Sequence, residues 1–368
     1  MRNSKITWAV VAGVLVALLA GVGVAIAVSR NSSKPDAAPA NPAAASAGPT
    51  SAAPSASPSP SPGADIEGPL DLVLVGVDTR VSIPDWEPHA DAIMLLHVDA
   101  GLESAYLYSL PRDLRVEMPA YKKAGFGGGR HKITEAMSRG SRIPGSNKHS
   151  VEQGYELLTK TLSQYTGIKT FQGGAILNFG GLDKLVDQLG GIDMTIDQKV
   201  KSRHRKPDGT MRPLASGGGD YVGPQKVYNP GKQRLIGWEA IDYARQRYGL
   251  PNGDYDRQRH QRQLVEAILA KGLSQGLTDP DRLGGLINAL GESLIYVGGR
   301  TPFEYAYALR DLTPNRITTV SLPGAGIGRG GGYLGEQLKT EGTGFLKALA
   351  KNQHKAYLAQ HPKLVDKG

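Results

Sequence analysis

The sequence predicts a layered α/β fold, because short apolar segments rich in strand-forming residues are mixed with segments of helical periodicity. Three apolar runs, at residues 70–77, 92–98 and 104–110, are each bounded by Asp, Gly or Pro. They predict buried strands of one sheet. Helical spacing appears over residues 151–166 and again over 182–189. Strands and helices mixed on this scale indicate layers packed around a common core.

The same two periodicities continue toward the C-terminus. Gly190 and Gly191 end the second helix, and residues 192–196 predict another strand. Between residues 198 and 234, Gly, Pro and charged residues interrupt the periodicity, which predicts a long loop. The later elements that we expect are helices at 237–247 and about 254–271, and a strand at 316–322 before a glycine-rich stretch.

The N-terminal segment predicts a membrane anchor. Residues 6–28 hold one polar side chain, Thr7, and a bilayer-spanning helix needs about 20 apolar residues. The apolar core of a secretory signal is shorter, about 7 to 15 residues. Because Arg2 and Lys5 precede the run, the N-terminus should stay in the cytoplasm and the remainder of the chain should lie outside. We therefore expect a single-pass protein of the cell membrane.

A linker should separate this anchor from the folded part of the chain. Residues 35–64 are almost entirely Ala, Pro and Ser, with eight prolines, so they lack the side chains that build a core. The expected organisation is a cytoplasmic head at 1–5, a transmembrane helix at 6–28, a disordered linker at 29–68, a catalytic domain at 69–345 and a C-terminal tail at 346–368.

Composition excludes several classes of function. The chain has 43 Lys and Arg against 34 Asp and Glu, a formal charge of +9, but four of the basic residues lie in residues 1–34. The remainder is modestly basic, so no nucleic-acid partner is predicted. A basic run at 199–206 is most simply a solvated part of the predicted loop. The chain has no cysteine, which excludes disulfides and thiolate chemistry.

Residues 243–263 are the segment most suggestive of a site. In a helix that begins near Asp254, residues 254, 257 and 261 share one face, which brings Asp254, Arg257 and Gln261 together. Arg259 and Arg262 then point elsewhere. Guanidinium groups grip phosphate oxygens through paired hydrogen bonds, so converging arginines suit a pyrophosphate or a phosphodiester. The alternative is an exposed helix with ordinary surface ion pairs.

The ends of the predicted strands supply further charged residues. Asp78 follows the first strand, Asp91 precedes the second and Arg112 follows the third. Loops at strand ends usually build the sites of α/β proteins. Two carboxylates that converge at such an edge can hold Mg²⁺, which prefers oxygen ligands and phosphate-bearing substrates. Taken singly, each aspartate is equally compatible with a capping or turn role.

Several of these segments together resemble the LytR-CpsA-Psr family of cell-envelope transferases over about residues 69–271. The segments that carry the resemblance, in family order, are VGVDTR, ADAIML, LPRDLRV, KITEAMSRG, ILNFGGLDKLVDQLGGIDM, GWEAIDYARQR and GDYDRQRHQ. The resemblance implies a single αβα domain with a mixed central sheet, facing the cell wall. It also implies transfer of a glycan phosphate from a polyprenyl pyrophosphate lipid, whose tail occupies an apolar cavity, to peptidoglycan.

The resemblance also implies roles for individual residues. Asp78 and Asp91 would bind Mg²⁺, or Mn²⁺, and Asp254 would either orient Arg257 or accept the proton of the attacking hydroxyl. The residues implied in catalysis are Arg112, Asp254 and Arg257. Those implied in pyrophosphate binding are Arg80, Arg112, Arg245, Arg247, Arg257 and Gln261.

Two positions depart from the family pattern. His89 stands where an arginine is usual, and His260 replaces the arginine that commonly precedes Gln261. A neutral imidazole at position 89 would weaken a phosphate contact near pH 7. A protein that binds lipid-linked precursors or wall polymer without turnover is therefore the alternative function. A transcription regulator is disfavoured by the predicted outward topology and by the lack of a helix-turn-helix pattern.

Overall fold

The computed structural model describes residues 62–77, 87–275, 280–329 and 332–366. The predicted cytoplasmic head, the predicted transmembrane helix and most of the predicted linker lie outside these ranges. Asp78 and Arg80 lie outside them as well. Within the described ranges, no helix is both long enough and apolar enough to cross a bilayer.

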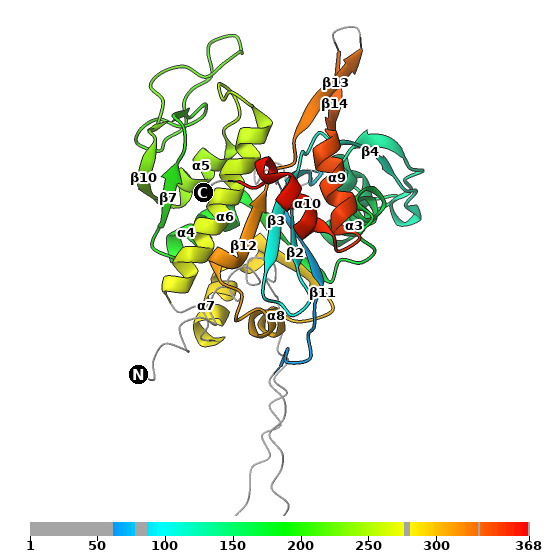
Figure 1. Cartoon of the computed structure of the whole chain (residues 1–368). Coiled ribbons are helices and arrows are strands. Elements are labelled where there is room, and N and C mark those ends of the chain that lie inside the picture. Colours follow the sequence, from blue (N-terminus) through cyan, green and yellow to red (C-terminus); the bar gives the residue numbers. More distant parts are fainter. Residues whose placement is uncertain (1–61, 78–86, 276–279, 330–331, 367–368) are drawn as a thin grey trace, which may run out of the picture.

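A six-stranded mixed sheet forms the centre of the domain (Figure 1). Its strands, in spatial order, are β11 (Leu294–Gly298), β6 (Gly173–Asn178), β1 (Leu70–Val77), β2 (Ala90–Val98), β3 (Ala105–Leu110) and β12 (Ile317–Val320). The β1–β6 and β3–β12 pairs are parallel, whereas the β1–β2, β2–β3 and β6–β11 pairs are antiparallel. The three apolar runs recognised in the sequence are thus adjacent strands of one sheet.

Helices cover both faces of this sheet, because successive side chains of each strand point to opposite sides. In β1, Leu72 and Leu74 join one apolar core, and Val73 and Val75 join the other. The first core is completed by α4 (Phe179–Gln188), α5 (Gly237–Arg245), α6 (Asp254–Ser274) and α7 (Pro280–Leu290). The second is completed by α2 (Glu135–Ser141), α3 (Val151–Thr166), α9 (Thr340–Leu349) and α10 (His354–Gln360).

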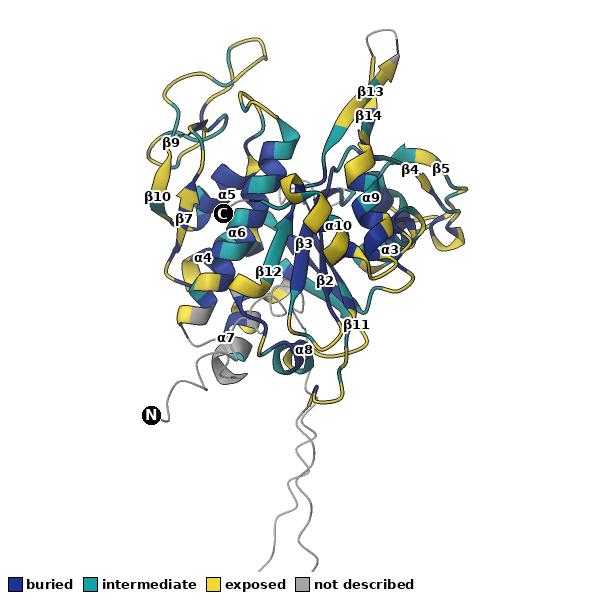
Figure 2. Cartoon of the chain, in the orientation of Figure 1, coloured by how far each residue is buried: buried dark blue, intermediate teal, exposed yellow. Residues whose placement is uncertain are grey.

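This arrangement confirms the mixed central sheet and layered fold that the sequence predicts. Figure 2 shows the buried residues concentrated in the sheet strands and on the inner sides of the helices. Helix α3 has the predicted bounds because its ends are capped: the side chain of Ser150 accepts from the backbone N–H of Gln153, and Gly167 adopts the left-handed conformation. Helix α4 begins at Phe179, since Asn178 caps it through the N–H of Gly181.

The prediction of a long loop at 198–234 is only partly correct. Its last residues form β10 (Gly231–Leu235), which pairs antiparallel with β7 (Ile192–Ile196), and β8 (Val200–Lys201) pairs with β9 (Val227–Tyr228). Most of β10 is exposed and polar, so its sequence lacks the alternation that marks a half-buried strand. The helix predicted at 237–247 ends at Arg245, because Gln246 is extended.

The remaining elements surround the layered core. They are β4 (Arg115–Met118), which pairs with β5 (Gly129–Lys132), the helix α8 (Pro302–Ala308), and the hairpin of β13 (Gly324–Arg329) and β14 (Gly332–Leu338). The hairpin projects from the body of the domain (Figure 1). The domain boundary expected after residue 345 falls within α9, and Leu358 and Leu364 beyond it are buried in the second core.

Candidate active site

Asp91 and Arg112 meet at one edge of the central sheet. In the β2–β3 ladder Ile93 is opposite Leu110, so the same register continued by two residues places position 91 opposite position 112. Nη1 of Arg112 donates a hydrogen bond of 2.6 Å to Oδ1 of Asp91. Both side chains are largely buried. The strand-end pair recognised in the sequence is therefore a direct ion pair.

Asp254 and Arg257 add a second ion pair from the first turn of α6. Their i,i+3 spacing brings Nη2 of Arg257 within 2.8 Å of Oδ1 of Asp254, as the helical face predicts. Oδ2 of Asp254 accepts a hydrogen bond of 3.2 Å from the amide of Gln258. Oδ1 has an ion-pair contact with Arg257 but no hydrogen bond among the described residues, and Asp254 lies against the guanidinium of Arg257.

The two pairs act on each other electrostatically. Burial by itself disfavours the charged form of Arg112, but Asp91, and to a smaller extent Asp254, raise the pKa of this guanidinium above its usual range. Burial lowers the pKa of Arg257, and the charge of Arg112 adds to this effect, whereas Asp254 and Asp91 oppose it. We call Asp91, Arg112, Asp254 and Arg257 the charge cluster.

Unsatisfied donors in the charge cluster point to a ligand. The Nε atoms of Arg112 and Arg257 are buried, and neither has a hydrogen-bond partner among the described residues. An unsatisfied buried donor costs about 1–3 kcal/mol, and more when it is charged. Arg257 is only 5% exposed. An anion that accepts from these two guanidinium groups would remove this cost, and phosphate oxygens have the geometry to do so.

An apolar pocket opens at the same edge of the sheet. It is a narrow cavity of about 50 Å³ between the sheet and helices α4, α5 and α6. Its polar lining residues are Asn178, Arg245 and Gln261, and its apolar lining includes Leu74, Met94, Leu177, Leu182, Leu264 and Val265. The pocket adjoins the charge cluster, since Ala92 and Gln261 line it while Asp91 and Arg257 on the same elements belong to the cluster.

The predicted site residues divide into three groups. Asp91, Arg112, Asp254 and Arg257 come together in the charge cluster, and Arg245 and Gln261 line the pocket instead. The guanidinium of Arg245 stacks on the ring of Phe179, 4.0 Å from its centroid. Arg247 lies apart, where its Nη2 donates to the hydroxyl of Tyr248 at 3.0 Å. Asp78 and Arg80 lie outside the described residues.

The other arginines of α6 have structural roles, as the helical face predicts. Arg259 bonds to Asp197 and Asp256, each at 2.6 Å, and Arg262 bonds to Asp366. His260 is fully buried against the ring of Tyr243. The replacement of arginine by histidine at position 260 therefore affects packing beneath the site. The other departure, His89, contacts the backbone carbonyl of Glu87 through Nδ1 at 2.9 Å.

The lining of the pocket was missed by sequence reasoning, because its residues have the same apolar character as ordinary core. One signal was present at Asn178 and Phe179. Phe179 directly follows Asn178, which ends strand β6 and caps helix α4. An aromatic ring at such a strand end can stack on the guanidinium of an arginine, as Phe179 does with Arg245. That signal does not by itself distinguish a pocket from a packed interior.

The fold and these contacts define an α/β protein with a buried arginine–carboxylate site beside an apolar pocket. The sequence model of the LytR_cpsA_psr family matches residues 36–348. The chain therefore belongs to this family.

Similar proteins agree with this membership. The cell wall biosynthesis protein LcpA of Corynebacterium glutamicum is 27% identical over 301 residues, which are 76% of this chain and 54% of LcpA. The polyisoprenyl-teichoic acid–peptidoglycan teichoic acid transferase TagU of Enterococcus faecalis is 28% identical over 206 residues, 56% of this chain and 54% of TagU. The chain spans about half the length of the curated relatives it matches.

Solved structures share the fold. The crystal structure of protein gbs0355 from Streptococcus agalactiae is 22% identical to this chain and superposes with a TM-score of 0.59. The match covers 78% of this chain and 87% of that one. At this identity the likeness concerns the arrangement of strands and helices.

Proposed function

We propose that this protein transfers a phosphate-linked glycopolymer from a polyprenyl pyrophosphate carrier to peptidoglycan, at the outer face of the cell membrane. Membership of the LytR_cpsA_psr family and the transferase activity for which the relative TagU is named support this proposal. The observation that carries it is the pair of buried, unsatisfied guanidinium Nε atoms near an apolar pocket. A lipid pyrophosphate has the two matching parts, a charged head and an apolar tail.

The charge cluster provides the electrostatics for such a transfer. When the acceptor hydroxyl attacks the phosphorus that carries the glycan, a new O–P bond forms and the bridging P–O bond breaks. Polyprenyl phosphate leaves with the bridging oxygen, and the hydroxyl proton passes to Asp254 or to water. Charge spreads over the phosphoryl oxygens in the transition state, where Arg112 and Arg257 donate to them. Asp91 and Asp254 hold these two donors in position before the substrate arrives.

A divalent cation is the expected cofactor. Asp91 supplies a carboxylate of the type that Mg²⁺ and Mn²⁺ prefer, and Arg112 engages only its Oδ1. Asp91 and Asp78 would hold the ion, which would neutralise charge on the pyrophosphate when bound.

The pocket suits the lipid part of the substrate. Its walls are predominantly apolar side chains, its polar lining residues are Asn178, Arg245 and Gln261, and the cavity would widen to admit an isoprenoid chain. An isoprenoid tail in this pocket removes apolar surface from water at about 25 cal/mol per Å². Arg245, fixed on the ring of Phe179, would then hold an outer oxygen of the pyrophosphate.

A membrane anchor at residues 6–28 would keep the domain next to its lipid substrate. The acceptor, peptidoglycan, lies outside the membrane, so the proposed reaction requires the outward topology that Arg2 and Lys5 predict. The proposed location is the cell membrane, with the N-terminus in the cytoplasm and the large domain facing the cell wall.

The test is glycan transfer by the full-length protein in detergent, from a short-chain polyprenyl pyrophosphate glycan to peptidoglycan, in Mg²⁺ or in EDTA. Turnover that requires the metal and disappears in Asp91→Ala and Arg257→Ala would support the reaction and its site. Turnover that persists in EDTA would show that the reaction does not require a divalent cation. If the wild type binds the lipid without turnover with any acceptor, the protein is a binding protein for lipid-linked precursors.

A further inference from the structure

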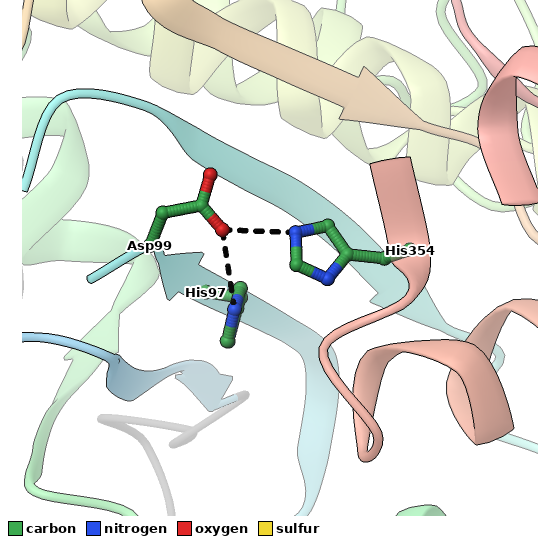
Figure 3. A group of neighbouring side chains, drawn as sticks. All are labelled: His97, Asp99 and His354. Atoms are coloured by element: carbon green, nitrogen blue, oxygen red, sulfur yellow. Dashed lines mark hydrogen bonds and ion pairs between the residues drawn. The ribbon is translucent and has the colours of Figure 1, made fainter. Parts of the chain in front are cut away.

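A second cluster of polar side chains is buried at the opposite end of strand β2. His97, Asp99 and His354 bring their side chains together there, and Figure 3 shows both imidazole rings directed at the carboxylate of Asp99. Position 97 is six residues along the strand from Asp91, which corresponds to about 20 Å. This group is therefore separate from the charge cluster, and we propose that it is a binding site for a zinc ion.

The distances match those of a metal site. His97 Nε2, Asp99 Oδ1 and His354 Nε2 are suitable ligand atoms, and one ligand atom of each residue lies within 4.8 Å of the others. Asp99 Oδ1 is 3.7 Å from His97 Nε2 and 2.9 Å from His354 Nε2. With metal–ligand bonds of about 2.1 Å, neighbouring ligands of a tetrahedral zinc are about 3.3 Å apart. Small side-chain movements would bring both contacts to this value.

The tautomer of His97 favours binding of a cation at its Nε2 atom. Its Nδ1 lies 2.8 Å from Oδ1 of Asp71, and a carboxylate only accepts, so Nδ1 carries the proton. In the neutral ring Nε2 then presents a lone pair toward the oxygen of Asp99, and this atom is buried without a hydrogen-bond partner among the described residues. Two electron-rich atoms that face each other in a buried site attract a cation between them. Nε2 of His354 donates to Asp99 Oδ1 in the metal-free protein, so it would release its proton when it binds the ion.

Asp71 would act on the metal through His97. It is the direct cross-strand neighbour of His97 in the β1–β2 ladder. A carboxylate that receives the second N–H of a ligating histidine fixes the ring and makes it a better ligand. Asp71 would therefore be a positioning residue, and its loss should weaken metal binding by about 10- to 100-fold.

The surroundings of Asp99 leave one of its oxygens for the metal. Oδ2 accepts from the hydroxyl of Ser104 at 2.6 Å and from the ammonium of Lys355 at 2.9 Å, whereas both histidines approach Oδ1. Lys355 is largely exposed, so solvent screens its charge. Its ammonium still opposes a nearby cation, and its removal should tighten zinc binding. Three protein ligands would leave the fourth position to water.

The metal would fasten the C-terminal helices to the sheet. His97 lies in the last residues of β2, Asp99 directly follows this strand, and His354 is the first residue of α10. A zinc ion that joins these segments would stabilise the folded state by mass action without taking part in transfer.

The test is zinc binding by the full-length protein in detergent, after removal of bound metal with EDTA. The wild type should regain one zinc ion per chain, and its Tm should rise by about 5 °C when free zinc exceeds the Kd about 100-fold. His97→Gln and His354→Gln should lose both effects, Asp71→Asn should bind more weakly, and Lys355→Gln more tightly. Co²⁺, used as a spectroscopic substitute, should show the visible absorption of a tetrahedral site in the wild type and not in His97→Gln or His354→Gln.

Two variants serve as controls. Asp91→Ala should keep the zinc, because it alters only the charge cluster. His361→Gln should also keep it, since this histidine directly follows α10 but stacks on Tyr357, away from Asp99. The proposal is overturned if the wild type takes up no zinc, or if His97→Gln and His354→Gln, shown to be folded by circular dichroism, bind it as the wild type does. The three residues are then a metal-free hydrogen-bonded group.

Discussion

Arg112 Nη1 lies 2.6 Å from Asp91 Oδ1, across the end of the β2–β3 ladder. The ladder fixes both backbones, so the guanidinium is held in one orientation before any substrate binds. Its Nε remains buried and without a partner in the described part of the chain. A charged donor fixed in this way loses little entropy when it binds a phosphate, and this preorganisation is the main source of electrostatic catalysis.

The first prediction concerns Arg257, the other guanidinium of the charge cluster. Arg257→Lys keeps a positive charge but loses the planar donor group, so we expect kcat/KM for glycan transfer to fall by about 100-fold. The kcat/KM of Arg257→Ala should fall further, since this substitution also leaves Asp254 without its ion-pair partner. The measurement is the rate of transfer from a labelled lipid substrate.

Arg259→Gln is the matched control for this prediction. Arg259 lies on the same helix two residues away, but its guanidinium bonds to Asp197 and Asp256 rather than to the charge cluster. Its replacement should lower Tm and leave kcat/KM within about threefold of the wild type. Equal losses of rate in the Arg257 and Arg259 variants would mean that both substitutions act by destabilising the fold, and that Arg257 has no specific role in transfer.

The second prediction concerns the apolar pocket. Ala244 is a buried wall residue on α5, and Ala244→Phe would place a ring inside the cavity. We expect the KM for a long-chain carrier to rise about tenfold, whereas the KM for a very short-chain analogue should change little. Overpacking a filled core costs about 1–3 kcal/mol, so an unchanged Tm would itself indicate a real cavity. If both substrates respond equally, the lipid tail binds elsewhere.

The third prediction uses the pH dependence of stability. Burial opposes the ionisation of Asp197, but hydrogen bonds from His260 and Arg259 outweigh it and hold the pKa of this carboxyl well below its ordinary 3.8. Because the folded pKa is depressed, the stabilisation is fully present above the unfolded pKa and is lost as pH falls through the folded value. Because Asp197 is partly exposed to solvent, Asp197→Asn should lower the free energy of unfolding by about 1 kcal/mol at pH 7.

Denaturant unfolding at several pH values tests this expectation. The difference between wild type and Asp197→Asn should be constant from pH 7 to about pH 5 and should shrink below about pH 4. Asp193→Asn is the control, because Asp193 lies in β7, shortly before Asp197, and forms no ion pair within the described residues. A difference that does not change with pH would show that Asp197 acts through packing instead of through its charge.

The sequence is most informative where a local pattern determines the structure. The strand at 70–77 and the helix at 151–166 have their predicted bounds, because apolar runs and caps are local signals. The pairing of Asp254 with Arg257 follows from helical spacing alone. The pairing of Asp91 with Arg112 was expected only as convergence at a sheet edge, since the register of two strands depends on the whole ladder.

Features that depend on distant segments were not predicted. Strand β10 forms because its backbone completes the edge of β7, although its own residues are mostly exposed and polar. His354 lies 255 positions after Asp99 in sequence, so no spacing rule relates the two. Arg247 was assigned to phosphate binding with its neighbour Arg245, yet the end of α5 at residue 245 directs Arg247 toward Tyr248.

The last prediction concerns topology, because the proposed reaction requires the domain and peptidoglycan to share a compartment. In intact cells, added protease should degrade an epitope tag placed after residue 368 and leave a tag before residue 1 untouched. A cytoplasmic protein that stays intact is the control for leakage. Removal of residues 1–28 should prevent export, so the domain should then remain protected inside the cell.

The linker makes the same experiment more specific. At about 3.1 Å per residue in an extended polyproline conformation, residues 35–64 would reach about 90 Å from the membrane. Protease should therefore cut first in the predicted linker and release a fragment that contains the folded domain. If both tags are protected, the domain lies in the cytoplasm. Transfer to peptidoglycan is then excluded, because the acceptor and the charge cluster would be on opposite sides of the membrane.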